Sequence, residues 1–261
     1  MNLKNNRHLN IIYIISIIII TILVYLPSFK VPFILDDIAK IVDNPDIRNF
    51  KNLKTKLIYP YSKKHVWERN DPSRPVVYLT FTLNYFFGKL NPFGYHLVNL
   101  TVHIFNVILI FILTKKIISF LSQYPNFPIS QFQFFSFLVA LFFAVHPVNT
   151  SAVTYIFGRS VVLSTFFYLL ALLLFIETIK KYSLISQSLN LSISVLCFIL
   201  ALFSRQDAVT LPAIILIFDC IFLSDYKISE LLKKRNIIFP IGQYLFCFCY
   251  LDTFILVKLV I

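Results

Sequence analysis

Long apolar blocks separated by short polar segments are the dominant pattern along this chain. The first block, from Ile11 to Leu26, has Ser16 and Thr21 as mild polar interruptions. A helix needs about 20 apolar residues to cross the ~30 Å hydrocarbon core of a bilayer. The pattern predicts an all-α membrane protein, a polytopic helical bundle of about seven spans near residues 10–28, 94–114, 132–147, 160–179, 187–204, 208–224 and 237–258.

One polar stretch, residues 29–93, is too long to be a tight connection between the first two spans. Its charged and apolar residues alternate, as in the segment from Ile47 to Leu53. This pattern is typical of short amphipathic helices that lie on the membrane interface. We therefore expect residues 1–261 to form a single transmembrane module, with residues 29–93 as its first extracytoplasmic loop.

Composition supports a membrane protein, because 58% of the 261 residues are hydrophobic and the mean hydropathy is +0.77. Soluble domains are about 45–50% apolar. The net charge of +12 would indicate nucleic-acid binding in a soluble protein. Here the basic residues mostly lie between apolar blocks, where they set topology and contact anionic headgroups. We expect membrane lipids as partners and no nucleic acid.

The orientation follows from the basic residues of the short loops. With the N-terminus in the cytoplasm, the inner loops carry ten lysines and arginines, and the short outer loops carry Arg159 and Arg205. The loop at 29–93 holds eleven basic and six acidic residues and runs against the rule, but long translocated segments weaken it. This orientation places the residues with the most varied chemistry on the outer side.

The acidic pair Asp36-Asp37 follows the first span directly. Two adjacent carboxylates near a membrane repel each other, and burial raises the pKa of a carboxyl group. Such a pair suits a general base, and it is also a candidate ligand set for a divalent cation. A helix cap is the alternative, because aspartate is common where a helix begins.

Four polar residues, His96, Asn99, His103 and Asn106, recur at spacings of three and four within the second apolar block. On a helix they fall on one face, within about 80°. Polar residues inside a membrane face a bundle interior or a wet cavity. The face therefore either lines a functional cavity or joins helices through hydrogen bonds.

Arginines at the ends of apolar blocks are candidates for phosphate binding, because the guanidinium group presents a rigid fork of donors. Arg159 and Arg205 each lie at the outer end of a block, and Arg74 lies in the first loop. Contact with lipid headgroups is the alternative for each arginine alone. His146 ends the third block before Pro147 and is a further candidate at the mouth of a cavity.

Several strings of these residues occur in the order found in GT-C membrane glycosyltransferases. The chain resembles the transmembrane-and-TPR-containing protein O-mannosyltransferases and their bacterial counterparts over about residues 30–225. The strings that carry the resemblance are Phe33-Ile34-Leu35-Asp36-Asp37, Asn44-Pro45-Asp46-Ile47, Ser73-Arg74-Pro75-Val76, Asn91 to Asn99 with His103, Phe143 to Val148, Tyr155-Ile156-Phe157-Gly158-Arg159, and Ser204 to Asp219.

The resemblance implies transfer of a sugar, such as mannose, from a polyprenyl-phosphate donor to a hydroxyl of a protein or glycan on the non-cytoplasmic face. It implies that Asp36 or Asp37 is the catalytic base or a metal ligand, and it makes Arg159 and Arg205 candidates to hold the donor phosphate. We also expect Arg74, His96, His146 and Asp207 to bind substrate. The expected location is the inner membrane in a prokaryote or the endoplasmic reticulum in a eukaryote. No certain cofactor is implied beyond a candidate divalent cation.

The chain also departs from the family pattern. Ser151 stands where the family has glutamate after its His-Pro motif, and Gln206 stands where the family has glutamate after Ser-Lys, with Asp207 following. The relatives carry more spans and a TPR region beyond the length of this chain, so we expect a chain cut short at its C-terminus. The alternative function is a non-catalytic membrane protein that binds lipid-phosphate or a partner.

Overall fold

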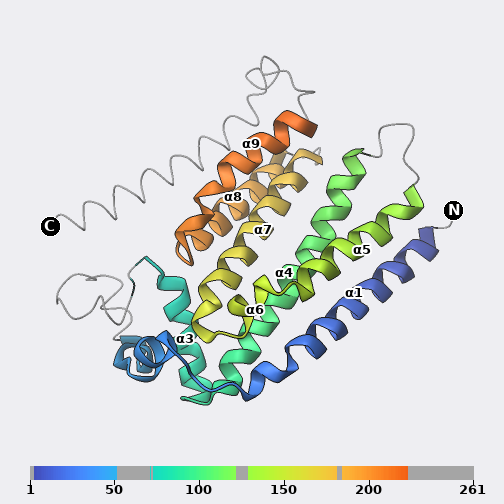
Figure 1. Ribbon diagram of the computed structural model, residues 1–261. Coiled ribbons are helices and arrows are strands. Elements are labelled where there is room, and N and C mark those ends of the chain that lie inside the picture. The colour runs from blue at the N-terminus through green and yellow to red at the C-terminus, as the bar shows by residue number, and fades with distance from the viewer. Residues whose placement is uncertain (1–2, 52–70, 72, 122–128, 181–183, 223–261) are drawn as a thin grey trace.

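The computed structural model describes residues 3–51, 71, 73–121, 129–180 and 184–222, and every regular element within these ranges is a helix. The long helices lie roughly side by side, and the short ones gather at one end of the bundle (Figure 1). Helices satisfy their backbone hydrogen bonds internally, which a span through lipid requires. The expectation of an all-α membrane protein is confirmed.

Four helical segments are long and apolar enough to cross a membrane: His8–Lys30, Pro92–Phe120, Ile156–Thr178 and Ile185–Leu202. They contain helices α1 (Leu3–Tyr25), α4 (Pro92–Leu121), α7 (Arg159–Lys180) and α8 (Leu184–Leu202).

Two of the remaining expected spans match shorter helices, α5 (Ile129–Val145) and α9 (Leu211–Phe222). The expected span at 237–258 lies outside the described residues. The count of seven spans therefore stays a prediction.

The bundle has two halves, which meet where α4 packs against α7. In one half α5 packs against α4 and α1, and in the other α7 packs against α8 (Figure 1). Buried alanines lie in both halves, with Ala140 and Ala144 in the first and Ala171 and Ala201 in the second. Small side chains let helix backbones approach closely in a membrane, where dispersion contacts take the place of the hydrophobic effect.

Short helices after α1 form a compact cap at one end of the bundle. These are η1 (Leu26–Lys30), η2 (Ile38–Val42), η3 (Pro45–Arg48) and α3 (Pro75–Gly88). One face of α3 is buried, with Val77 and Phe81 inside, while Leu83 and Phe87 are exposed. Short helices are therefore present in the described part of the loop, and the expectation that they are amphipathic and lie on the membrane surface stays a prediction.

A tight turn connects α5 to α7 at the same end. Helix α6 (Val148–Val153) is followed by η5 (Ile156–Gly158), and α7 begins immediately at Arg159. A Cβ atom at Gly158 would lie 2.7 Å from the backbone oxygen of Ser151 and 2.8 Å from that of Ala152. Glycine is therefore required where the turn folds back on α6.

Candidate functional site

The two carboxylates of the acidic pair point to different environments. Asp37 is completely buried, whereas the side chain of Asp36 is exposed. Asp37 Oδ2 accepts a hydrogen bond from the Ile34 amide at 3.2 Å, and Oδ1 accepts one from the Phe157 amide at 2.8 Å. Asp37 therefore closes its own turn and ties the first loop to η5, which leaves Asp36 as the carboxylate that a ligand can reach.

The backbone before Asp36 is strained. Leu35 has a φ of 50°, a left-handed conformation that disfavours side chains with a Cβ, and its side chain is 78% exposed. Such strain persists where the surrounding structure enforces it, and it is frequent at functional sites. Here the hydrogen bonds that Asp37 accepts from the Ile34 and Phe157 amides hold the turn in this conformation.

Burial raises the pKa of Asp37, against the lowering effect of the amides of Ile34 and Phe157, and the neighbouring charge of Asp36 adds to the rise. Both Asp37 oxygens already accept hydrogen bonds from backbone amides. The described residues bring no three His, Cys, Asp or Glu side chains together as metal ligands. The donor set therefore does not fit a divalent cation held by the pair.

Tyr155 contacts Asp36, and a second tyrosine, Tyr78, lies within its electrostatic influence. The Asp36 amide donates a hydrogen bond of 3.1 Å to the Tyr155 hydroxyl, which also interacts with the Asp36 carboxylate. Burial raises the pKa of Tyr155 to about 12, and the charges of Asp36 and Asp37 add to the rise. Burial likewise raises the pKa of Tyr78 to about 12, with Asp36 as a minor contributor. Both hydroxyls stay protonated at neutral pH.

Arg74 lies at the edge of this group. Its Nε atom is 3.0 Å from Asp71 Oδ2, and both residues act electrostatically on Tyr78. The Val76 amide at the start of α3 donates a 3.4 Å hydrogen bond to the Phe203 carbonyl after α8. The structure thus places Arg74 at the same end as the loop that carries Arg205.

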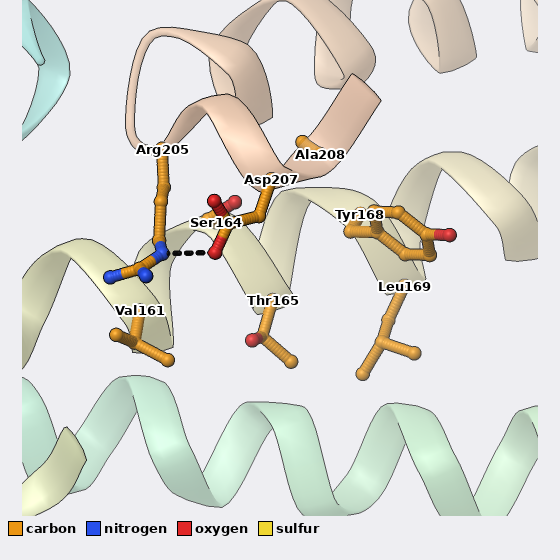
Figure 2. Close-up of a pocket in the computed structure, with 8 residues that line it drawn as sticks. All are labelled: Val161, Ser164, Thr165, Tyr168, Leu169, Arg205, Asp207 and Ala208. Carbon is orange, nitrogen blue, oxygen red and sulfur yellow. Dashed lines mark hydrogen bonds and ion pairs between the residues drawn. The ribbon is translucent and has the colours of Figure 1, made fainter. Parts of the chain in front are cut away.

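A cavity of about 310 Å³ lies beside that loop, between α7 and η6 (Gln206–Thr210). Figure 2 shows Arg205 paired with Asp207 beside the first turns of α7. Arg205 Nε lies 2.5 Å from Asp207 Oδ2. The walls combine apolar side chains, hydroxyls and this ion pair. The lining residues are Val161, Ser164, Thr165, Tyr168, Leu169, Arg205, Asp207 and Ala208. The cavity thus places the guanidinium of Arg205 near the hydroxyl groups of Ser164, Thr165 and Tyr168.

Arg159 is completely buried and is enclosed by protein groups. Its donors reach Asn99 Oδ1 at 2.7 Å, Asn84 Oδ1 at 2.5 Å and the Tyr95 carbonyl at 2.8 Å. The guanidinium carbon lies 4.5 Å from the centre of the Phe81 ring. The expected contact with donor phosphate stays a prediction, and the observed contacts join α3, α4 and α7.

The polar face of α4 joins the helix to its neighbours. His96 Nε2 lies 2.9 Å from the Val31 carbonyl, and His103 Nε2 lies 3.2 Å from the Ala144 carbonyl. Asn106 donates to the Val162 carbonyl at 2.9 Å. Of the two roles that the spacing left open, these contacts support the joining of helices. A substrate contact by His96 stays a prediction.

His146 takes part in the turn after α5. Its Nδ1 atom accepts a 3.2 Å hydrogen bond from the Val148 amide, and its ring lies 5.0 Å from that of Phe142. The residue is half-buried and lies between α5 and α6. Its role in substrate binding also stays a prediction.

Sequence reasoning missed Tyr155, Tyr78 and Asp71 as members of this group. Tyr155 lies inside one of the strings that carry the family resemblance, which was the available signal. Tyr78 and Asp71 carried none, because a tyrosine in an apolar helix and an aspartate in a polar loop are ordinary.

Several known proteins that are similar to this chain are named protein O-mannosyl-transferases. Protein O-mannosyl-transferase Tmtc3 of Drosophila melanogaster is 31% identical over 186 residues, which are 67% of this chain and 20% of that protein. The human protein O-mannosyl-transferase TMTC3 is 29% identical over 214 residues, 79% of this chain and 21% of that protein. The chain resembles the N-terminal part of protein O-mannosyl-transferases.

Human protein O-mannosyl-transferase TMTC1 shows the same relationship, with 29% identity over 214 residues, 78% of this chain and 23% of that protein. The chain thus spans about a fifth of the length of these O-mannosyl-transferases. No family model matches the chain, and no solved structure matches it. The resemblance expected from the ordered strings is confirmed, and with the apolar helices it identifies an integral membrane protein.

The two departures from the O-mannosyltransferase pattern lie at exposed positions of the same end. Ser151 in α6 donates a 3.1 Å hydrogen bond to the Val148 carbonyl, and Gln206 begins η6. Neither position is buried in the network around Asp37 and Arg159. The side chains at both positions therefore make none of the hydrogen bonds described above for Asp37 and Arg159.

Proposed function

We propose that this chain is part of a glycosyltransferase that moves a hexose such as mannose from a polyprenyl-phosphate donor to a hydroxyl of a protein. The observation that carries the proposal is the exposed carboxylate of Asp36, which follows the first apolar segment, His8–Lys30. Its neighbour Asp37 is buried and holds this part of the loop in place. The resemblance to proteins named O-mannosyl-transferases supports the reaction class.

Asp36 acts as the general base in this proposal. It takes the proton of the acceptor hydroxyl while that oxygen attacks the anomeric carbon of the sugar. The bond between the anomeric carbon and the phosphate oxygen breaks, and the phosphate leaves with the bonding electron pair. Attack from the side opposite the phosphate inverts the anomeric centre.

Cationic side chains stabilise the departing phosphate, because charge builds up on its oxygens. Arg205 is the strongest candidate, since its guanidinium is partly exposed beside a cavity with hydroxyl groups. Arg74 is the second, at the edge of the group around Asp36. Each is held by one aspartate that a phosphate can displace.

The proposed protein crosses the membrane several times, with the N-terminus in the cytoplasm and Asp36 on the opposite side. This orientation follows from the excess of basic residues in the short inner loops. It corresponds to the inner membrane of a prokaryote or the endoplasmic reticulum of a eukaryote. A donor held by a polyprenyl tail diffuses within that same bilayer.

A second candidate function is binding without transfer. Ser151 and Gln206 replace two acidic residues of the family pattern, which favours a protein that binds lipid-phosphate and does not turn it over. Binding of a polyprenyl-phosphate sugar with no transfer from the intact protein would support this alternative.

The deciding experiment measures transfer of labelled mannose from polyprenyl-phosphate mannose in membranes that contain the full protein. We expect Asp36→Asn to lower the rate by about 10²- to 10⁴-fold, the usual contribution of a general base. Asp43→Asn is the matched control, because Asp43 is an exposed aspartate of the same loop. Undiminished transfer by Asp36→Asn would overturn the proposal.

A further inference from the structure

Arg159 ranks first by residue volume among the fully buried side chains of the described residues. Burying a cation is costly unless hydrogen bonds and nearby charge compensate for the lost water. Here Asn99, Asn84 and the Tyr95 carbonyl accept its hydrogen bonds. The negative charge of Asp37 also favours the charged form of the guanidinium.

Asn99 connects this arginine to the turn before α7. Its Oδ1 atom accepts the hydrogen bond from Arg159 Nε, which fixes the orientation of the amide. The Nδ2 atom then points at three carbonyls of the turn, at 3.2–3.4 Å: those of Val153, Tyr155 and Ile156. One side-chain amide thus holds the turn against α4.

The turn in turn holds the acidic pair. The Phe157 amide donates to Asp37, and the Tyr155 hydroxyl accepts from the Asp36 amide. The segment that Asn99 binds is therefore the segment that fixes both aspartates. The path from Arg159 to Asp36 passes through one side chain and one short turn.

We propose that Arg159 is a positioning residue for Asp36, which acts through Asn99 and the turn at 155–157 and does not contact substrate. This inference rests on the proposed function of Asp36 as a base. A misplacement of about 1 Å can lower a rate by about 10²-fold, so the path matters for catalysis.

Arginine suits this position because its planar fork reaches several acceptors at fixed angles. Lysine supplies the charge without the fork, and methionine supplies a similar length without charge or donors. Either replacement frees the amide of Asn99 to rotate, so the turn loses its anchor while the helices stay packed.

The first measurement is hydrogen–deuterium exchange of the purified full protein, which reports on positioning without any activity. We expect Arg159→Met to speed exchange of the Phe157 and Asp36 amides by about tenfold or more, the effect of losing about 1.4 kcal/mol of local stability. Asn106→Ala is the matched control. It removes another buried amide between α4 and α7 that does not bind the turn, and we expect unchanged exchange at these positions.

The second measurement separates kcat from KM for mannose transfer, normalised to the folded fraction. We expect Arg159→Met to lower kcat by about 10- to 100-fold while KM for the donor changes less than about threefold. Because Arg159 acts through Asn99 on the same turn that binds Asp37, Asp37→Asn should add little to the loss in the double variant. A purely structural role would lower the folded fraction and leave kcat unchanged.

Unchanged exchange at Phe157 and Asp36 in Arg159→Met would overturn the inference, as would a raised KM with normal kcat, which indicates substrate contact. Faster exchange in a protein that shows no transfer even as wild type would support the positioning and overturn the proposed function instead. If Arg159→Met does not fold, Arg159→Lys provides the same two measurements.

Discussion

The carboxylate of Asp37 accepts a hydrogen bond of 2.8 Å from the amide of Phe157, which lies 120 positions further along the chain. This bond assigns different roles to two adjacent aspartates. Asp37 joins the first loop to the turn before α7, and Asp36 is left exposed beside Tyr155. The site therefore depends on a contact between two segments that the long helices bring together.

Asp37 predicts a specific dependence of stability on pH. Burial raises its pKa above the ordinary value of about 3.9, so the folded protein holds this proton at pH values where the unfolded chain has lost it. Between the two pKa values the folded state binds more protons, and stability falls as pH rises. We expect the thermal unfolding midpoint in detergent to fall with rising pH through this window, with a shallower slope in Asp37→Asn.

The control for this slope is Asp43→Asn, which removes an exposed carboxyl from the same loop and should keep the wild-type slope. Comparison of variants cancels the contribution of the other carboxyl groups. Equal slopes in all three proteins would show that Asp37 is not the group responsible.

The close packing at Gly158 predicts that adding a single methyl group there lowers the stability of the protein. In Gly158→Ala the new Cβ atom meets two backbone oxygens, those of Ser151 and Ala152, within 2.8 Å, so the turn must move. Overpacking of this kind destabilises by about 1–3 kcal/mol. Thermal unfolding measures the loss, and Gly88→Ala is the control because its Cβ meets nothing within 4 Å. A normal midpoint for Gly158→Ala would contradict the geometry.

Replacing either of two asparagines on one face of α4, Asn99 or Asn106, should lower the stability of the protein by different amounts. Asn99→Ala leaves buried Arg159 Nε without its acceptor and removes the donor to three carbonyls. Removing one partner of a buried polar group destabilises by about 1–3 kcal/mol, and by more for a charged group. Asn106→Ala removes one hydrogen bond, to Val162, and should lose about 1 kcal/mol. Equal midpoints for the two variants would argue against the bridging role of Asn99.

The orientation can be tested by labelling single cysteines with a membrane-impermeant maleimide. We expect Asp43→Cys, in the loop of the acidic pair, to react in sealed vesicles or cells whose outer surface is the non-cytoplasmic face. Ser183→Cys, in the connection between α7 and α8, should react after permeabilisation. The background replaces Cys197, Cys220, Cys247 and Cys249 with alanine. The reverse labelling pattern would invert the proposed topology.

The class of fold was predictable because long apolar blocks have few stable alternatives to membrane helices. The end of α4 was less predictable. Lys115 and Lys116 indicate a helix end near residue 114, yet α4 continues to Leu121. Lys115 donates a hydrogen bond to Asn10 of α1, and Lys116 forms an ion pair with Glu177 of α7. Side chains of neighbouring helices therefore provide polar partners for both lysines.

The candidate site was predictable in its composition and unpredictable in its roles. The sequence places Asp36, Asp37 and Arg159 at the same end of the bundle, but only packing distinguishes the exposed aspartate from the buried one. An arginine at the start of an apolar block looks the same whether it faces phosphate or a neighbouring helix. The position of Asn99, 60 residues away in the chain, decides its contacts.

Helix α7 has polar anchors near both of its ends. Arg159 and Asn99 fix its first turn beside the acidic pair, and Glu177 pairs with Lys116 near its far end. At 1.5 Å per residue, about 27 Å of rigid helix separates these anchors. Helix α7 begins directly after the turn whose Phe157 amide binds Asp37. A shift of α7 along its axis would therefore displace the turn that holds the acidic pair.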